Sequence, residues 1–419
     1  MAKKRKEKSP ESTKTELPKK EAGSKNPISW IVFLFSISIV LITFVSVMFP
    51  ALILVSGTPS IPGIEPVTPG QFETGVWAGG VIAANIITLG LAFLYFKNRL
   101  PSFLSSLFAK VFSFEVSKKT AFIVVAVLLA IYLIASSSEL ATQEIYEDYN
   151  GVKNRLENWP ANLSSFEPHV RYFFLKSSIV LFGNDRVVPL LASAALLVVT
   201  YFLTKTITQK RFAGIVAVVI LMQSNLFLTY DTTVSYTHFW VLFYLLSLYF
   251  VSRFWPLSPV SYLLSIPSKA LTAAFMPMSI YFILRSSISK RQKMITSIIT
   301  AGMILVGGLA YFSGPSGSQE TDEEFNGKEF WMGFTSFSYQ LRSDGLVILF
   351  MIPLIVGLFL VSKSGVKHGE SIMVLISGML LIAPFLTGFT NQTNQPYRFV
   401  PLVAFFAIGV GVLLSKRQV

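Results

Sequence analysis

The chain has no cysteine, three histidines and few acidic residues, and each shortage excludes a class of chemistry. Without cysteine there are no disulfides, no thiolate metal ligands and no thiol nucleophile. Three histidines with few carboxylates near them do not make up a metal centre, so we expect no metal and no cofactor. No glycine-rich phosphate-binding loop is present either, which argues against ATP or a nucleotide sugar as a substrate.

Apolar residues are abundant: 52% of the 419 residues are hydrophobic and 14% are charged. Runs long enough to cross a bilayer recur between Trp30 and Leu414. They predict an all-α fold, a polytopic transmembrane bundle, because a bilayer offers backbone polar groups no partner outside a helix. In a soluble protein a net charge of +13 would suggest nucleic acid as a binding partner. Here Lys and Arg lie mostly at the ends of apolar runs, so we expect membrane lipids as partners and no nucleic acid.

The apolar pattern divides into about twelve candidate spans, near residues 28–55, 76–97, 120–137, 169–183, 187–205, 212–229, 236–253, 257–285, 294–313, 344–362, 371–389 and 398–415. The basic segments between them predict a multi-pass protein of the cell membrane with both termini cytoplasmic and the larger loops outside. Twelve full spans would place Lys205, Lys210 and Arg211 outside, against this rule. The alternative is that 169–183 is re-entrant and that 257–285 is a hairpin broken at Pro267.

Composition also divides the chain along its length. Residues 1–27 are rich in lysine and lack aromatic clusters, which predicts a disordered basic cytoplasmic tail. Residues 28–119 would form a two-span N-terminal extension, a region through which a membrane partner could bind. Residues 120–419 would form the main transmembrane domain.

The first large outer loop is acidic in a chain that is otherwise basic. Apolar residues recur there at steps of four, three and four, namely at Ile145, Tyr149, Val152 and Leu156. This spacing predicts an amphipathic juxtamembrane helix. Glu144, Asp148 and Arg155 would then share one flank of it. The flank is either a solvated surface or the site of a carboxylate base, whose pKa burial and a like charge would raise.

The sequence that follows resembles the polytopic glycosyltransferases of the C superfamily, which include protein O-mannosyltransferases and lipid A aminoarabinose transferases. The resemblance covers residues 120–419 and depends on the order of short motifs. These are Glu144 in the loop, Glu167-Pro168, Tyr172, Phe182-Gly183, Arg186, Lys205, Pro267-Ser268-Lys269 and Tyr397-Arg398. Where the family has adjacent Asp-Glu, this chain has Gln143-Glu144 and then Glu147-Asp148. Counting back from Leu156-Glu157 favours Glu144 as the base, with Asp148 and Glu147 as the other candidates.

The resemblance implies inverting transfer of a sugar from a polyprenyl-phosphate donor to a hydroxyl of a protein or lipid acceptor on the outer face. In this chemistry a carboxylate takes the acceptor proton and cations hold the leaving phosphate. The candidate phosphate ligands near the outer boundary are Arg398, Arg171, Lys269 and Arg342. Arg171 and Arg398 could instead be interfacial anchors, and Arg342 could simply pair with Asp344. Lys269, beside a proline within an apolar run, is less easily explained without a function.

Two other classes of function remain open at this level. A transporter or flippase of a lipid-linked or small polar solute would show internal repeats and broken helices in corresponding positions. We find one broken segment, near Pro267, and no convincing repeat. A non-catalytic membrane scaffold would need neither an outer acid nor cations at the boundary. The acidic loop together with these cations therefore favours the enzyme.

Overall fold

The computed structural model describes residues 27–53, 72–97, 99–146, 148–159, 168–313, 325–334, 341, 344–390 and 396–415. Within these ranges all regular secondary structure is helical, as predicted. The helices of the first half are α1 (Pro27–Met48), α2 (Pro50–Ile53), α3 (Ala78–Phe96), α4 (Ser102–Ser113), α5 (Lys118–Ser137), η1 (Ser138–Ala141), α6 (Asp148–Glu157), α7 (His169–Phe182), α8 (Val187–Thr208) and α9 (Arg211–Met222).

The remaining helices make up the second half of the chain. They are α10 (Asn225–Tyr230), α11 (Phe239–Arg253), α12 (Leu257–Ser265), η2 (Ala270–Phe275), α13 (Met276–Arg285), α14 (Lys290–Ser313), α15 (Gly327–Gly333), α17 (Gly345–Lys363), α18 (His368–Thr390), η3 (Pro396–Phe399) and α19 (Val400–Leu413). Seven of the described helices are long and apolar enough to cross a membrane: α1, α3, α5, α8, α17, α18 and the η3–α19 segment. The chain is therefore built as a multi-pass membrane protein.

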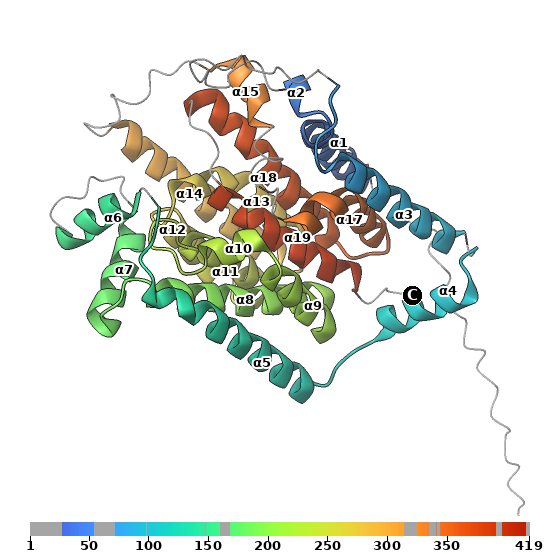
Figure 1. The fold of residues 1–419 in the computed structure, drawn as a ribbon, viewed down its shortest axis with the longest axis horizontal. Helices are drawn as coiled ribbons and strands as arrows, with labels where there is room; N and C mark the ends of the chain where they lie inside the picture. The colour runs from blue at the N-terminus through green and yellow to red at the C-terminus, as the bar shows by residue number, and fades with distance from the viewer. Residues whose placement is uncertain are drawn as a thin grey trace, which may run out of the picture.

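The last helix, α19, lies at the centre of the bundle (Figure 1). It carries no charged residue and is the most completely buried of the seven candidate spans. Small residues let it approach α8 and α9 closely. A Cβ atom at Gly411 would lie 2.4 Å from the side chain of Thr204 and 2.8 Å from the carbonyl oxygen of Ala213. By contrast, α3 and α5 are mostly exposed apolar helices at the edges of the bundle.

The first helix packs into this bundle, against α17 and α18. Serines along one side of α1 bind groups far away in the sequence. Ser36 Oγ donates to Ser377 Oγ at 3.2 Å, and Ser46 Oγ donates to the carbonyl oxygen of Phe334 at 2.9 Å. The predicted boundary after residue 119 remains a prediction, but α1 contributes to the core of the main domain.

A buried carboxylate, Glu370, joins four helices. It is 1% exposed. Ser362 Oγ donates to it at 2.9 Å and Tyr281 Oη at 3.0 Å, while Ser29 Oγ donates to it and Arg285 forms an ion pair with it. These partners come from α17, α13 and α1, and Glu370 itself lies in the first turn of α18. The group therefore fixes how α1 is placed on the bundle.

Replacing Glu370 with leucine is expected to destabilise the protein by about 3–5 kcal/mol, because Arg285 would keep a buried charge without its partner. Thermal unfolding in detergent, followed by size-exclusion chromatography, would measure the loss. The double variant Glu370→Leu with Arg285→Leu should recover much of the stability, since the uncompensated charge is then removed. Glu157→Leu, at an exposed position of α6, is the matched control. Equal melting temperatures for Glu370→Leu and Glu157→Leu would contradict this role.

The turn between α8 and α9 lies against the segment that links α4 to α5. Lys210 Nζ donates to the carbonyl oxygen of Phe112 at 2.8 Å, and Arg211 donates from its guanidinium to the carbonyl oxygen of Val116 at 3.0 Å. Twelve full spans would put these two segments on opposite sides of the membrane. Their contact does not fit that arrangement. It fits the alternative, in which 169–183 does not cross and 257–285 is a hairpin.

The segment 257–285 is indeed broken near Pro267. Helix α12 ends at Ser265, and the chain resumes as η2 and then α13. Proline lacks an amide hydrogen and clashes with the preceding helical turn, so a helix ends here readily. The carbonyl oxygen of Pro267 accepts a hydrogen bond from the amide of Val170 at 3.2 Å. The break is thereby joined to the start of α7, and together they form one side of the site.

Candidate functional site

A cavity of about 620 Å³ opens where α6, the start of α7, the turn after α10, the break after α12 and η3 meet. Five charged side chains line it: Asp148, Arg155, Arg171, Lys269 and Arg398. One acid facing four bases makes the cavity positive, and charges in such a confined place attract anions strongly. Asp148, Arg171, Lys269 and Arg398 were predicted from the sequence as site residues, and the structure brings these four together.

The cations reach the cavity from four separate elements, of which α6 supplies Arg155. Arg171 lies in the first turn of α7, and its Nη2 donates to the carbonyl oxygen of Val234 at 3.0 Å. Its Nε is buried and has no hydrogen-bond partner among the described residues. Lys269 stands in the break after α12, and Arg398 in η3. A set of donors converging from different elements is the arrangement that binds phosphate oxygens.

Two stacked tyrosines connect the acid of the cavity with one of its cations. Tyr236 Oη donates to Asp148 Oδ2 at 2.7 Å, and Lys269 Nζ donates to Tyr397 Oη at 2.7 Å. The two rings stack at 4.2 Å between centroids, with 15° between their planes. The stack fixes both hydroxyl groups, and each hydroxyl orients one charged group at the cavity wall.

Glu144 lies beside the cavity and does not line it. It is 7% exposed, and its two carboxylate oxygens accept hydrogen bonds from the backbone amides of Val234 at 2.6 Å and Ser235 at 3.0 Å. The carboxylate therefore holds the turn that carries Ser235 and Tyr236 into the cavity wall. The sequence-based preference for Glu144 over Asp148 as the base is not supported by this placement.

The predicted loop helix is present, but it starts later than its apolar spacing suggests. Helix α6 begins at Asp148, and Val152 and Leu156 are buried as expected. Ile145 lies before the helix and is 91% exposed. The prediction that Glu144 and Asp148 share a helical flank is wrong, because Glu144 belongs to the non-helical segment that precedes α6.

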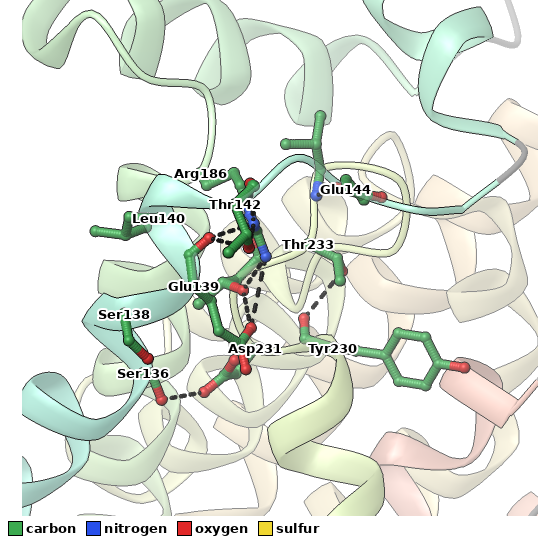
Figure 2. Close-up of polar contacts among 12 residues, drawn as sticks. Ser136, Ser138, Glu139, Leu140, Thr142, Glu144, Arg186, Tyr230, Asp231 and Thr233 are labelled. Atoms are coloured by element: carbon green, nitrogen blue, oxygen red, sulfur yellow. Dashed lines mark hydrogen bonds and ion pairs between the residues drawn. The ribbon is translucent and has the colours of Figure 1, made fainter.

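Arg186 joins two segments of the site. One carries Glu139 and Glu144, and the other leads to Tyr236. Figure 2 shows Arg186 between residues 139–142, which follow α5, and residues 231–233, which follow α10. It is 6% exposed and donates to the carbonyl oxygens of Thr142 at 2.7 Å and Thr232 at 3.1 Å. It also forms a 3.5 Å ion pair with Glu139. Arg186 does not line the cavity, and it acts by positioning the two segments that lead to it.

A further acid, Asp231, lies below this layer (Figure 2). Ser136 Oγ donates to its Oδ2 at 2.7 Å, and burial raises the pKa of Asp231 to about 6. A carboxyl group with such a pKa is suited to proton transfer. Asp231 does not line the cavity, however, and together with His238 it belongs to the buried turn between α10 and α11. Through Ser136 it joins that turn to α5.

Two predicted residues, Glu147 and Arg342, lie outside the described residues. The sequence analysis did not single out Tyr236. A tyrosine within an uncharged polar stretch between two apolar segments was the available signal. Among the described residues, no group of three or more His, Cys, Asp or Glu side chains is placed to hold a metal ion.

Comparison of the chain with models of known protein families, with curated proteins and with solved structures found no match.

Proposed function

We propose that the chain is a membrane glycosyltransferase that moves a sugar from a polyprenyl-phosphate donor to a hydroxyl of a protein or lipid acceptor. The observation that supports this most is the cavity itself, with one carboxylate and four cations at the end of the bundle where α6 and α7 lie. A phosphate ester requires cations, and a hydroxyl acceptor requires a base. The cavity places both within one space.

The proposed reaction is a single inverting displacement. Asp148 accepts the proton of the acceptor hydroxyl while the hydroxyl oxygen attacks the anomeric carbon of the sugar. The bond between that carbon and the phosphate oxygen breaks, and the electron pair leaves with the polyprenyl phosphate. Arg171, Lys269 and Arg398 bind the phosphate and stabilise the charge that it gains. Glu144 and Arg186 position the cavity wall and do not touch the reacting atoms.

The contacts also support a topology. We place α6, α7 and the cavity on the non-cytoplasmic side, and both termini in the cytoplasm. Helix α7 lies along the outer surface, because both of its ends are joined to the turn after α10, through Arg171 at one end and Arg186 just beyond the other. The segment α12–η2–α13 enters from the cytoplasmic side and returns to it after the break near Lys269. The turn between α8 and α9 is then cytoplasmic, as its basic residues require.

Single cysteines test this topology, because the chain has none of its own. Gln209→Cys, in the turn between α8 and α9, and Ser113→Cys are expected to react with an impermeant thiol reagent from the cytoplasmic side only. Asn158→Cys, at the end of α6, should react from the opposite side only. Labelling of Gln209→Cys from the same side as Asn158→Cys would restore the arrangement with twelve full spans.

The function is tested by the lipid that the protein retains. Mass spectrometry of lipids extracted from the purified protein should show polyprenyl phosphate carrying a sugar. The double variant Arg171→Leu with Lys269→Leu should lose this lipid, while Lys153→Leu, on the exposed side of α6, should keep it. Adding a hydroxyl acceptor should then release free polyprenyl phosphate from the wild-type protein. Equal amounts of the lipid in wild type and double variant would contradict the proposal.

A further inference from the structure

Helix α4 is amphipathic and has no buried residue. On a helix of 3.6 residues per turn, its apolar side chains fall on one half and its serines and Lys110 on the other. Phe103, Leu107 and Val111, one turn apart along the apolar half, are 72%, 46% and 38% exposed. Such a face is costly in water, where each apolar side chain loses the stabilisation of burial.

The bundle fixes where α4 lies without covering this face. On one side Phe108 and Phe112 approach the ring of Tyr95 at the end of α3, at 6.0 Å and 6.4 Å between centroids. At its C-terminal end the buried Lys210 donates to the carbonyl oxygen of Phe112, and Phe114 contacts Phe212 edge to face at 4.8 Å. Figure 1 shows α4 between α3 and α5, at the edge of the bundle opposite α6 and α7.

The surroundings of α4 are strongly basic. Residues 97–119 contain five basic residues, all exposed, and one acid. That acid, Glu115, accepts hydrogen bonds from the amides of Arg211 at 3.1 Å and Val116 at 3.0 Å, so its charge is turned inward to the start of α9. The exposed charge around the apolar face is therefore positive.

We propose that α4 lies in the membrane interface and that its basic margin binds anionic phospholipids. Two observations select lipid as the occupant. The neighbouring spans α3 and α5, which meet α4 at either end, are the least buried of the candidate spans, so most of their apolar surface is free to contact lipid. The exposed positive charges complement anionic headgroups, which attract basic segments next to a membrane. An apolar face between two lipid-facing spans continues the same hydrophobic surface.

The inference does not depend on the proposed function, and its first test needs no activity. Full-length Leu107→Cys and Ser106→Cys proteins, one on each face of α4, would carry an environment-sensitive fluorophore and be reconstituted in vesicles of phosphatidylcholine and phosphatidylglycerol. The label at 107 should be quenched by nitroxide lipids and protected from aqueous iodide, and the label at 106 should behave in the opposite way. Iodide quenching at 107 equal to that at 106, or shielding of 107 from both quenchers by protein, would overturn the proposal.

Charge is tested in the same Leu107→Cys protein with nitroxide phosphatidylglycerol against nitroxide phosphatidylcholine. We expect the anionic lipid to quench at least about threefold more strongly at equal mole fraction, as attraction by several basic residues implies. Changing Lys110, Lys118 and Lys119 to glutamine should bring the ratio close to one, while Lys153→Gln in α6 should leave it unchanged. Equal quenching by the two lipids in the protein with its native charges would overturn the anionic preference even if the charge variant did not fold.

Discussion

Asp148→Asn is expected to lower the rate of sugar transfer by about two to four orders of magnitude, the usual contribution of a positioned general base. Asparagine keeps the size of the side chain, and its carbonyl oxygen can still accept the hydrogen bond from Tyr236 Oη. In the proposed reaction it loses the ability to take a proton from the acceptor. Transfer from a purified polyprenyl-phosphate sugar would measure the rate, and retention of that lipid would measure binding, which should stay close to the wild-type level.

Glu144→Gln is the informative comparison for this variant. A glutamine side chain has one acceptor oxygen, so the amides of Val234 and Ser235 could not both keep their present partner. An amide left without an acceptor costs about 1–3 kcal/mol, and the wall that carries Tyr236 would loosen. We therefore expect lower thermal stability together with partial loss of transfer. Full activity in Asp148→Asn, with complete loss in a Glu144→Gln protein of normal stability, would return the role of base to Glu144.

Lys269→Met is expected to lower turnover by about two to three orders of magnitude, since a cation on the leaving phosphate contributes about 2–4 kcal/mol to the transition state. Methionine has nearly the same length and no charge, so packing in the break after α12 should persist. Donor retention should fall less than turnover, because the phosphate gains charge as the sugar departs. Steady-state transfer rates and lipid retention would separate the two effects.

Lys153→Met, the same change at an exposed position of α6, should leave both quantities unchanged. The turnover of Arg398→Lys should lie between those of Lys269→Met and Lys153→Met. Lysine keeps the charge but loses the planar pair of donors that suits two phosphate oxygens. Turnover in Lys269→Met within a factor of two or so of wild type would remove this residue from the proposed site.

The sequence was sufficient to predict the features of the fold that depend on local residue patterns. Long uncharged runs predicted the membrane helices, since only a helix satisfies its own backbone in lipid, and Pro267 predicted the broken segment. Helix α7 was ambiguous for a physical reason. Exposed Phe173, Val180 and Leu181 suit lipid equally well whether the helix crosses the membrane or lies along it. Contacts at both of its ends with the turn after α10 support the proposed orientation along the surface.

The site was only partly predictable, because its decisive contacts are distant in the sequence. The cations could be found as charges at the borders of apolar runs. Whether Glu144 or Asp148 faces the cavity depends on backbone amides 90 and 91 residues after Glu144, in the turn after α10. Periodicity carries no information about such a pairing. It placed both acids on one helix, whereas the amides of Val234 and Ser235 hold Glu144 in the non-helical segment before it.

The link between Ser29 and Glu370 bears on how the protein is made. The two residues are 341 positions apart, so Glu370 leaves the ribosome long after Ser29. During synthesis α1 therefore enters the bilayer long before α17 and α18 exist to receive its serines. Its high apolar content keeps it stable in the bilayer before those helices are made. The serine hydroxyls can meanwhile bond to carbonyl oxygens of their own helix, as Ser46 does with Thr43. Helix α1 is thus made early relative to its partners, and a chain that stops before residue 370 leaves Ser29 without the carboxylate of Glu370.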